Sequence, residues 1–204
     1  MIGPVYFITD PDAGRPVTEQ ALAAARGGAR LIQLRDKGAD GDTMLRMARD
    51  LLALLRPLGV RLIVNDRVEV ARRAGADGLH IGQGDGDPAA IRERIGPEMM
   101  LGLSVETEAQ LESVPAQGVD YLGVGPVRAT ATKPDHAAPL GLDGLARIVA
   151  ATPLPCVAIG GLGAGDAPAL RAAGAQGMAV VTAISRAPDM EAATRALIAE
   201  WGAS

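Results

Sequence analysis

The sequence contains little cysteine and no long apolar run. Its single cysteine, Cys156, excludes an internal disulfide, so we expect a reducing, cytoplasmic setting. Because Cys156 lies in an apolar Pro-Cys-Val-Ala-Ile stretch, a small buried residue on a strand is favoured over a nucleophile. No run of about 18 apolar residues and no basic leader are present, so we expect neither a membrane partner nor a signal peptide.

Aromatic residues are also scarce, and positive charge is not concentrated. Aromatics make up 2% of the 204 residues, the net charge is −4, and the Lys and Arg residues are spread along the chain. Nucleic-acid binding usually needs a basic patch and stacking aromatics, so we expect no nucleic-acid partner. A small anionic substrate stays open, because a local cluster of cations can bind it whatever the net charge.

What the sequence does contain is eight short apolar runs that alternate with amphipathic stretches. Continuous apolar runs indicate strands buried on both faces, as in parallel sheets. Eight strand–helix units predict an α/β fold, a (β/α)₈ TIM barrel in a single domain over residues 1–204. A doubly wound open sheet is the alternative. The predicted strands are Val5–Ile8, Leu31–Leu34, Leu62–Val64, Gly78–Ile81, Met100–Leu103, Tyr121–Val124, Cys156–Ile159 and Met178–Val181.

The predicted helices between these strands are amphipathic, and several end at a glycine. Glycine there closes a helix in the left-handed conformation. A longer stretch, Ala129–Leu140, has the composition of a lid-like loop. The expected helices are Thr18–Arg26, Asp42–Arg56, Val68–Arg73, Pro88–Ile95, Glu106–Val114, Asp143–Ala151, Asp166–Ala173 and Met190–Trp201.

Polar residues follow the predicted strands, where the active site of such a barrel lies. Gln33, Arg35 and Lys37 alternate at the end of the second strand, so they share one side of it. Two converging cations would bind a polyanion. The alternative is a solvated strand end, with the cations paired to Asp36.

Two carboxylates follow neighbouring strands, and three interpretations of them stay open. Asp66 ends the third strand and Asp85 follows the fourth, so both are expected at the barrel mouth. They suit Mg²⁺, which takes a few carboxylates and completes its shell with water and phosphate oxygens. They could instead be a general acid and base, or Asp66 could only cap the next helix.

Hydroxyl groups and a further cation follow the fifth and sixth strands. Ser104 precedes Glu106 and Glu108, so it is either a helix N-cap or a donor to phosphate. The segment Thr130-Ala-Thr132-Lys133 offers two hydroxyls and an ammonium in a flexible loop, which favours anion binding. His80 lies within the fourth strand, where a buried histidine with satisfied hydrogen bonds is favoured over a catalytic one.

The seventh and eighth strands end in features typical of a phosphate site. Gly160-Gly161 follows the seventh strand and Val181-Thr182 closes the eighth. Barrels commonly bind phosphate there through backbone N–H groups, and glycine allows close approach of the backbone.

Together these residues resemble the thiamine phosphate synthase family along nearly the whole chain. The matching segments are Tyr6–Asp10, Gln33–Lys37, Val64–Arg67, Ala76–Gln83, Gly102–Ser104, Asp120–Pro126, Thr130–Lys133, Ala158–Gly161 and Val180–Ile184. The chain departs from the family's pattern at Thr182, where serine is usual, and at Arg128, where an apolar or aromatic residue is common.

The resemblance implies an activity and a role for each matching residue. The family couples a pyrimidine diphosphate to a thiazole phosphate, requires Mg²⁺, and releases pyrophosphate through a pyrimidinyl carbocation. The diphosphate would be held by Arg35, Lys37, Asn65, Ser104 and Lys133, of which all but Asn65 are the expected catalytic residues. Mg²⁺ would be held by Asp66 and Asp85, the pyrimidine by Gln33, and the thiazole phosphate by Thr130, Thr132, Gly161, Val181 and Thr182.

Other functions on the same barrel are alternatives to this one. A thiazole tautomerase-like isomerase needs no diphosphate or Mg²⁺ ligands, and a non-catalytic thiamine-pathway regulator needs no cation cluster. A sugar-phosphate epimerase needs an acid–base pair aimed at carbon. The combined presence of Arg35, Lys37, Asp66, Asp85 and Lys133 favours the synthase. The sequence leaves a homo-oligomer open.

Overall fold

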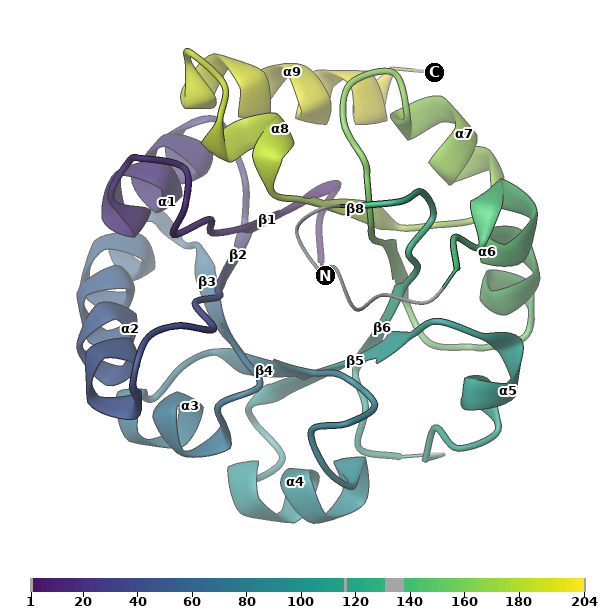
Figure 1. The fold of residues 1–204 in the computed structure, drawn as a ribbon, viewed down its shortest axis with the longest axis horizontal. Helices are drawn as coiled ribbons and strands as arrows, with labels where there is room; N and C mark the ends of the chain where they lie inside the picture. The colour runs from purple at the N-terminus through teal and green to yellow at the C-terminus, as the bar shows by residue number, and fades with distance from the viewer. Residues whose placement is uncertain (1, 116, 131–137, 204) are drawn as a thin grey trace.

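Eight parallel strands close into a barrel in chain order in the computed structural model, which describes residues 2–115, 117–130 and 138–203 (Figure 1). The single-domain (β/α)₈ architecture is therefore confirmed, and the open-sheet alternative is wrong, because β1 pairs with β8 as well as with β2. The strands are β1 Val5–Ile8, β2 Leu31–Leu34, β3 Arg61–Asn65, β4 Gly78–Ile81, β5 Met100–Val105, β6 Tyr121–Val124, β7 Cys156–Ala158 and β8 Gly177–Val180.

Helices surround the barrel (Figure 1) and follow the predicted order. They are α1 Val17–Arg26, α2 Gly41–Leu55, α3 Val68–Ala74, α4 Pro88–Ile95, α5 Glu108–Leu111, α6 Gly141–Ala150, α7 Ala167–Ala172, α8 Thr182–Ser185 and α9 Met190–Gly202, with the 3₁₀ turn Arg56–Leu58 after α2. In the described part of the chain, no helix is long and apolar enough to cross a membrane.

The bounds of most elements agree with the prediction within one or two residues, but two elements differ more. The helix expected over Glu106–Val114 is only the four-residue α5. The Gln110 side chain accepts a hydrogen bond from the Glu106 backbone N–H at 2.6 Å, ahead of the helix start, and Pro115 disfavours helical backbone at the residue before it. The short helix α8 was not predicted. It begins at Thr182, directly after the last strand, so Thr182 opens a helix rather than closing β8.

Apolar side chains form two cores, one on each side of the strands. The larger lies between strands and helices and includes Phe7, Leu62 and Cys156, so the prediction of a buried cysteine is confirmed. The smaller lies inside the barrel and contains Tyr6 and Tyr121. The interior core forms a base on which polar groups at the carboxyl ends of the strands can be held.

Glycines close several helix-to-strand connections, as the sequence predicted. Gly28, Gly75 and Gly174 have φ values of 108°, 67° and 88°, the left-handed region that glycine enters without a side-chain clash. Each then leads directly into the next strand, which keeps these connections at the amino ends of the strands short. The loops at the opposite end are free to carry chemistry.

Candidate active site

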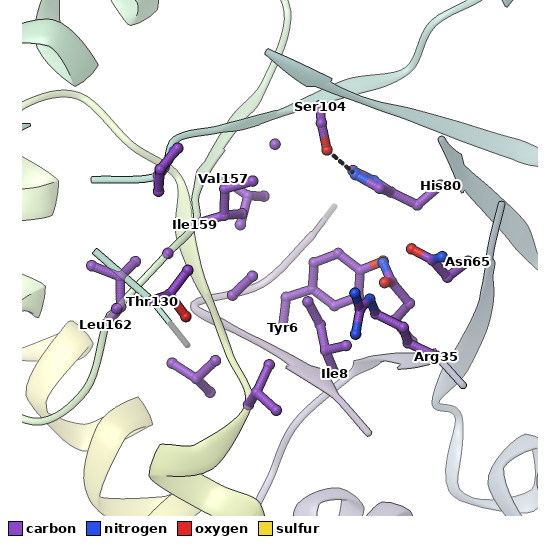
Figure 2. Close-up of a pocket in the computed structure, with 18 of the residues that line it drawn as sticks. Tyr6, Ile8, Arg35, Asn65, His80, Ser104, Thr130, Val157, Ile159 and Leu162 are labelled. Atoms are coloured by element: carbon purple, nitrogen blue, oxygen red, sulfur yellow. Dashed lines mark hydrogen bonds between the residues drawn. The ribbon is translucent and has the colours of Figure 1, made fainter. Parts of the chain in front are cut away.

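A cavity of about 880 Å³ lies at the carboxyl ends of the strands. Figure 2 shows Arg35, Asn65, His80 and Ser104 on one side, Thr130 and Leu162 on the other, and Tyr6 between them. Of the predicted site residues that the structure describes, all but Asp66 line this cavity: Gln33, Arg35, Lys37, Asn65, Asp85, Ser104, Thr130, Gly161, Val181 and Thr182. Thr132 and Lys133 lie outside the described residues.

The loop after β2 brings positive charge to the cavity. The Arg35 backbone N–H donates to the Thr9 hydroxyl oxygen at 3.1 Å, which fixes this loop against the end of β1. Lys37 extends further, with its side chain 57% exposed, and its ammonium forms an ion pair with Asp66. The alternative interpretation, in which these cations pair with Asp36, does not hold for Lys37. Asp36 instead accepts from the backbone of Gly38 and Ala39.

Asp66 is held in an unusual backbone conformation. Its φ is 48°, in the left-handed region that costs a non-glycine residue free energy and is often found at functional sites. Its N–H donates to the His80 carbonyl at 2.8 Å, and its carboxylate accepts from the Asn65 side chain at 2.7 Å. Helix α3 begins at Val68 with no side-chain cap, so the interpretation of Asp66 as only a helix cap is wrong.

Asp85 lies in the loop after β4, the strand beside β3. Its carboxylate accepts from the Gly82 backbone N–H at 2.6 Å, which turns this loop back toward the strand end. In the ranges the structure describes, no group of three or more His, Cys, Asp and Glu side chains gathers as a metal site. Asp66 and Asp85 follow adjacent strands, and two carboxylates fit Mg²⁺ in kind, because Mg²⁺ keeps waters and phosphate oxygens in its shell.

Ser104 lies inside β5, so its interpretation as a helix N-cap is wrong. Its side-chain oxygen is 2.9 Å from Nε2 of His80 (Figure 2), and its carbonyl accepts from the Gln83 amide at 2.7 Å. His80 is 8% exposed, and both of its ring nitrogens have partners. The expectation of a histidine with satisfied hydrogen bonds is confirmed, but it lines the cavity.

Two tyrosines that sequence reasoning did not single out form the base of the cavity. Tyr6 and Tyr121 pack edge to face, with ring centroids 6.1 Å apart, and their hydroxyl oxygens are 3.0 Å apart. Gln33 donates from Nε2 to the Tyr6 oxygen at 2.7 Å. Burial raises the pKa of both tyrosines above the ordinary range, so both stay neutral hydroxyls.

The opposite side of the cavity is built from the loops after β7 and β8. Gly160 and Gly161 have φ values of 92° and 66°. A Cβ at Gly161 would lie 2.7 Å from the Ala129 carbonyl oxygen, so only glycine allows the β7 loop to pack against the β6 loop. Val181 precedes α8 and Thr182 begins it, which places backbone N–H groups beside the glycine loop.

Arg128, where the chain departs from the family's residue pattern, has an ion-pair partner. Its guanidinium forms an ion pair with Asp166, whose side chain is only 8% exposed. Asp166 also accepts from the Gly163 backbone N–H at 2.8 Å. The pair therefore ties the β6 loop to the glycine loop after β7. The sequence signal for it was weak, because the two residues are far apart in the chain.

The sequence is similar to known proteins along almost its whole length. A family model described as thiamine monophosphate synthase matches residues 5–184. A thiamine-phosphate synthase of Azorhizobium caulinodans is 46% identical over 195 residues, which cover 95% of this chain and 92% of the relative. A thiamine-phosphate synthase of Solidesulfovibrio magneticus is 50% identical over 202 residues, covering 97% and 96%.

A solved structure is similar over almost the full length. It is a thiamine phosphate pyrophosphorylase from Pyrococcus furiosus, with a TM-score of 0.89 and 34% sequence identity. The match covers 98% of this chain and 95% of that chain.

Proposed function

Because the chain belongs to the thiamine monophosphate synthase family, we propose that it joins an aminopyrimidine diphosphate ester to a thiazole phosphate, giving thiamine phosphate and pyrophosphate. Membership makes it a transferase. The observation that carries the choice of substrates is one cavity with two different sides. Cations, an amide and a hydroxyl lie on the β2–β5 side, and a glycine-rich loop with a helix start lies on the β7–β8 side.

The β2–β5 side suits a diphosphate. Arg35 and Lys37 supply positive charge, and Asn65 and Ser104 supply hydrogen-bond donors within the same cavity. Arginine can bind phosphate oxygens through two parallel N–H groups, whereas lysine acts as a point charge. By the family resemblance, Lys133, which lies outside the described residues, would add a third cation.

Asp66 and Asp85 would hold Mg²⁺ against this diphosphate. Two carboxylates leave most of the shell to water and phosphate oxygens, which is the usual arrangement for Mg²⁺. Bound there, the ion would supply counter-charge to the departing diphosphate. Lys37 forms an ion pair with Asp66, and metal binding at that carboxylate would release the ammonium toward the diphosphate.

The β7–β8 side suits the single phosphate of the thiazole. Hydrogen-bond donors on this side can bind the thiazole phosphate without a cationic side chain. They are the Thr130 hydroxyl and the backbone N–H groups of Gly161, Val181 and Thr182. Thr182 keeps the hydroxyl and N–H of the usual serine. Arg128 is engaged with Asp166, so its role on this side is to hold the loop.

The reaction needs charge stabilisation rather than a protein nucleophile. The bond between the pyrimidine methylene and the diphosphate oxygen breaks, and its electron pair leaves with the diphosphate. The thiazole nitrogen then donates its lone pair to the cationic carbon. Arg35, Lys37 and Ser104 stabilise the charge that builds on the leaving group, and the opposite side positions the nitrogen.

Gln33 is placed to recognise the pyrimidine. Its Nε2 is engaged with Tyr6, so its carbonyl oxygen is the group left to accept a hydrogen bond from the ring's amino group. An acceptor at that amino group stabilises positive charge shared between the ring and the cationic carbon. The neutral tyrosines below offer an apolar, hydrogen-bonded base for the ring.

The proposal is tested by supplying both substrates with Mg²⁺ and measuring thiamine phosphate after oxidation to its fluorescent product. We expect product that needs both substrates and disappears when the metal is chelated. Product that survives chelation would refute the metal assignment. No product at all would refute the synthase, and isomerisation of the thiazole phosphate in the same sample would identify the tautomerase-like function instead.

A further inference from the structure

A chain of hydrogen bonds crosses the barrel interior from β2 to β5. It runs from Gln33 to Tyr6 at 2.7 Å, to Tyr121 at 3.0 Å, to Nδ1 of His80 at 3.0 Å, and from Nε2 of His80 to Ser104 at 2.9 Å. The first and last members line the cavity, as do the three between them. Four successive contacts thus connect the group expected to bind the pyrimidine with one expected to bind the diphosphate.

The glycines of β5 and β6 make room for this chain. In strand register, His80 lies opposite Gly102, and Gly102 lies opposite Tyr121. A Cβ at Gly102 would be 2.2 Å from the Tyr121 ring and 2.5 Å from Nδ1 of His80. Gly123 leaves similar space, because a Cβ there would be 3.1 Å from the His80 ring. The side chains of His80 and Tyr121 therefore meet over Gly102 of β5, which has no side chain to separate them.

The chain has a direction, because each neutral hydroxyl has a single hydrogen to donate. Either hydroxyl can be the donor between Tyr6 and Tyr121, but Gln33 already donates to the Tyr6 oxygen, and within this series the partner that can accept the Tyr6 hydrogen is Tyr121, so we assign it there. The Tyr121 hydrogen is then directed to Nδ1 of His80. An imidazole that accepts at Nδ1 carries its hydrogen on Nε2 and donates it to the oxygen of Ser104.

We propose that Tyr6, Tyr121 and His80 are positioning residues that leave the Ser104 hydrogen directed into the cavity, as a donor to the leaving diphosphate. In the reverse polarity Ser104 would give its hydrogen to His80 and present only lone pairs to an anion. The chain selects the productive orientation before substrate arrives, which is how a donor costs little reorganisation during reaction. This inference rests on the proposed function for its substrate.

The kinetic test is a double-mutant cycle between Tyr121→Phe and Ser104→Ala. Tyr121→Phe keeps the ring and deletes the hydroxyl, so we expect kcat to fall about tenfold with KM little changed, less than the roughly hundred- to thousandfold loss from removing an oxyanion donor itself. In the Ser104→Ala background the same change should cost nothing further, because its effect passes through Ser104. Full additivity would overturn the proposal.

A matched control deletes another buried hydroxyl far from the cavity. Thr194 is fully buried in α9 and donates to the Met190 carbonyl at 2.8 Å. Thr194→Val removes that hydroxyl at nearly constant shape, and we expect unchanged kcat. A loss in kcat equal to that of Tyr121→Phe would assign the effect to general destabilisation and overturn the positioning role.

A second readout needs no activity. The sequence has two histidines, so His136→Asn leaves His80 as the single imidazole for ¹⁵N NMR. At mildly alkaline pH we expect a protonated Nε2 and an unprotonated Nδ1, and a mixed tautomer in Tyr121→Phe. A protonated Nδ1 in the wild-type residue, or a tautomer that does not change in Tyr121→Phe, would contradict the proposed direction of the hydrogen bonds. If Tyr121→Phe fails to fold, Tyr6→Phe takes its place.

The kinetic and NMR measurements distinguish failure of the positioning role from failure of the proposed function. If the wild-type protein makes no thiamine phosphate, the synthase proposal fails, and the NMR result still decides the polarity of the chain. If product forms but the tautomer is wrong, the synthase stands and the positioning role fails.

Discussion

Replacing Gly161 with alanine should damage the cavity more than replacing Gly165, although both lie in one loop. Both glycines have positive φ, 66° and 88°, so each alanine should cost about 1–2 kcal/mol of backbone strain. They differ in surroundings. A Cβ at Gly161 would lie 2.7 Å from the Ala129 carbonyl oxygen and 2.9 Å from Cβ of Arg128, whereas a Cβ at Gly165 would have nothing within 4 Å.

The contact at Gly161 is with backbone and a Cβ, which cannot rotate away. Relieving it requires the β6 and β7 loops to separate, and such overpacking costs about 1–3 kcal/mol beyond the strain. We therefore expect Gly161→Ala to melt roughly 2–12 °C below Gly165→Ala. The displaced loop should also misplace N–H donors to the thiazole phosphate, raising its KM roughly 10- to 100-fold, the effect of losing one charge-assisted hydrogen bond.

The assay is thermal unfolding of both variants, followed by KM measurements for each substrate separately. The KM for the pyrimidine diphosphate should stay near the wild-type value in both variants, because its contacts lie on the β2–β5 side. Equal melting temperatures and equal KM values for the two variants would show that the packing of the glycine loop does not control the phosphate site.

Three further changes probe the other parts of the molecule. Asp66→Asn removes the negative charge, and asparagine tolerates the positive φ of this position, so the melting temperature should not change. The Mg²⁺ concentration for half-maximal activity should rise about tenfold or more. An unchanged metal titration would exclude Asp66 as a ligand. Arg35→Ala should lower kcat about a hundred- to a thousandfold without loss of stability, because the loop is held by the Arg35 backbone bond to Thr9; wild-type kinetics would contradict its role. Burial raises the pKa of the Cys156 thiol to about 11, so the thiol ionises at lower pH in the unfolded chain than in the folded protein. The free energy of unfolding should therefore fall by up to roughly 2–3 kcal/mol as pH rises from about 9 to about 11. Cys156→Ala should flatten that part of the curve of stability against pH, and an unchanged slope would contradict the linkage.

The strands and the polar residues after them could be predicted from the sequence for a physical reason. Strands buried on both faces are continuous apolar runs, so Leu31–Leu34 and Gly78–Ile81 were predicted with the bounds that the structure has. In a barrel, polar residues directly after such runs gather at one end, which is why Arg35, Lys37 and Asp85 were found as a group.

What could not be predicted depends on register and on contacts between distant segments. The hydrogen-bond chain requires Gly102 to lie between His80 and Tyr121, and that alignment is set by how neighbouring strands pair. Tyr6 was hidden because it lies within an apolar run. Ser104 looked like a helix start because two acidic residues follow it closely, but α5 begins only at Glu108.

The ion pairs around the cavity belong to the same class. Lys37 with Asp66 and Arg128 with Asp166 each join two loops that follow neighbouring strands, β2 with β3 and β6 with β7. Sequence reasoning identified the charges and their approximate place, but not which carboxylate each cation would choose. The roles expected of Thr132 and Lys133 stay predictions, because both residues lie outside the described ranges.

The pairing of β1 with β8 also has a consequence for how the chain is made. Val5 aligns with Met178, and a Cβ at Gly177 would lie 2.4 Å from the Gly3 carbonyl oxygen, so this closing contact needs a glycine. Until β8 has been synthesised, β1 and β7 are edge strands with unpaired backbone groups, which other chains can extend. A barrel that has not closed would thus offer two strand edges to other chains, and we expect a larger residue at Gly177 to favour aggregation.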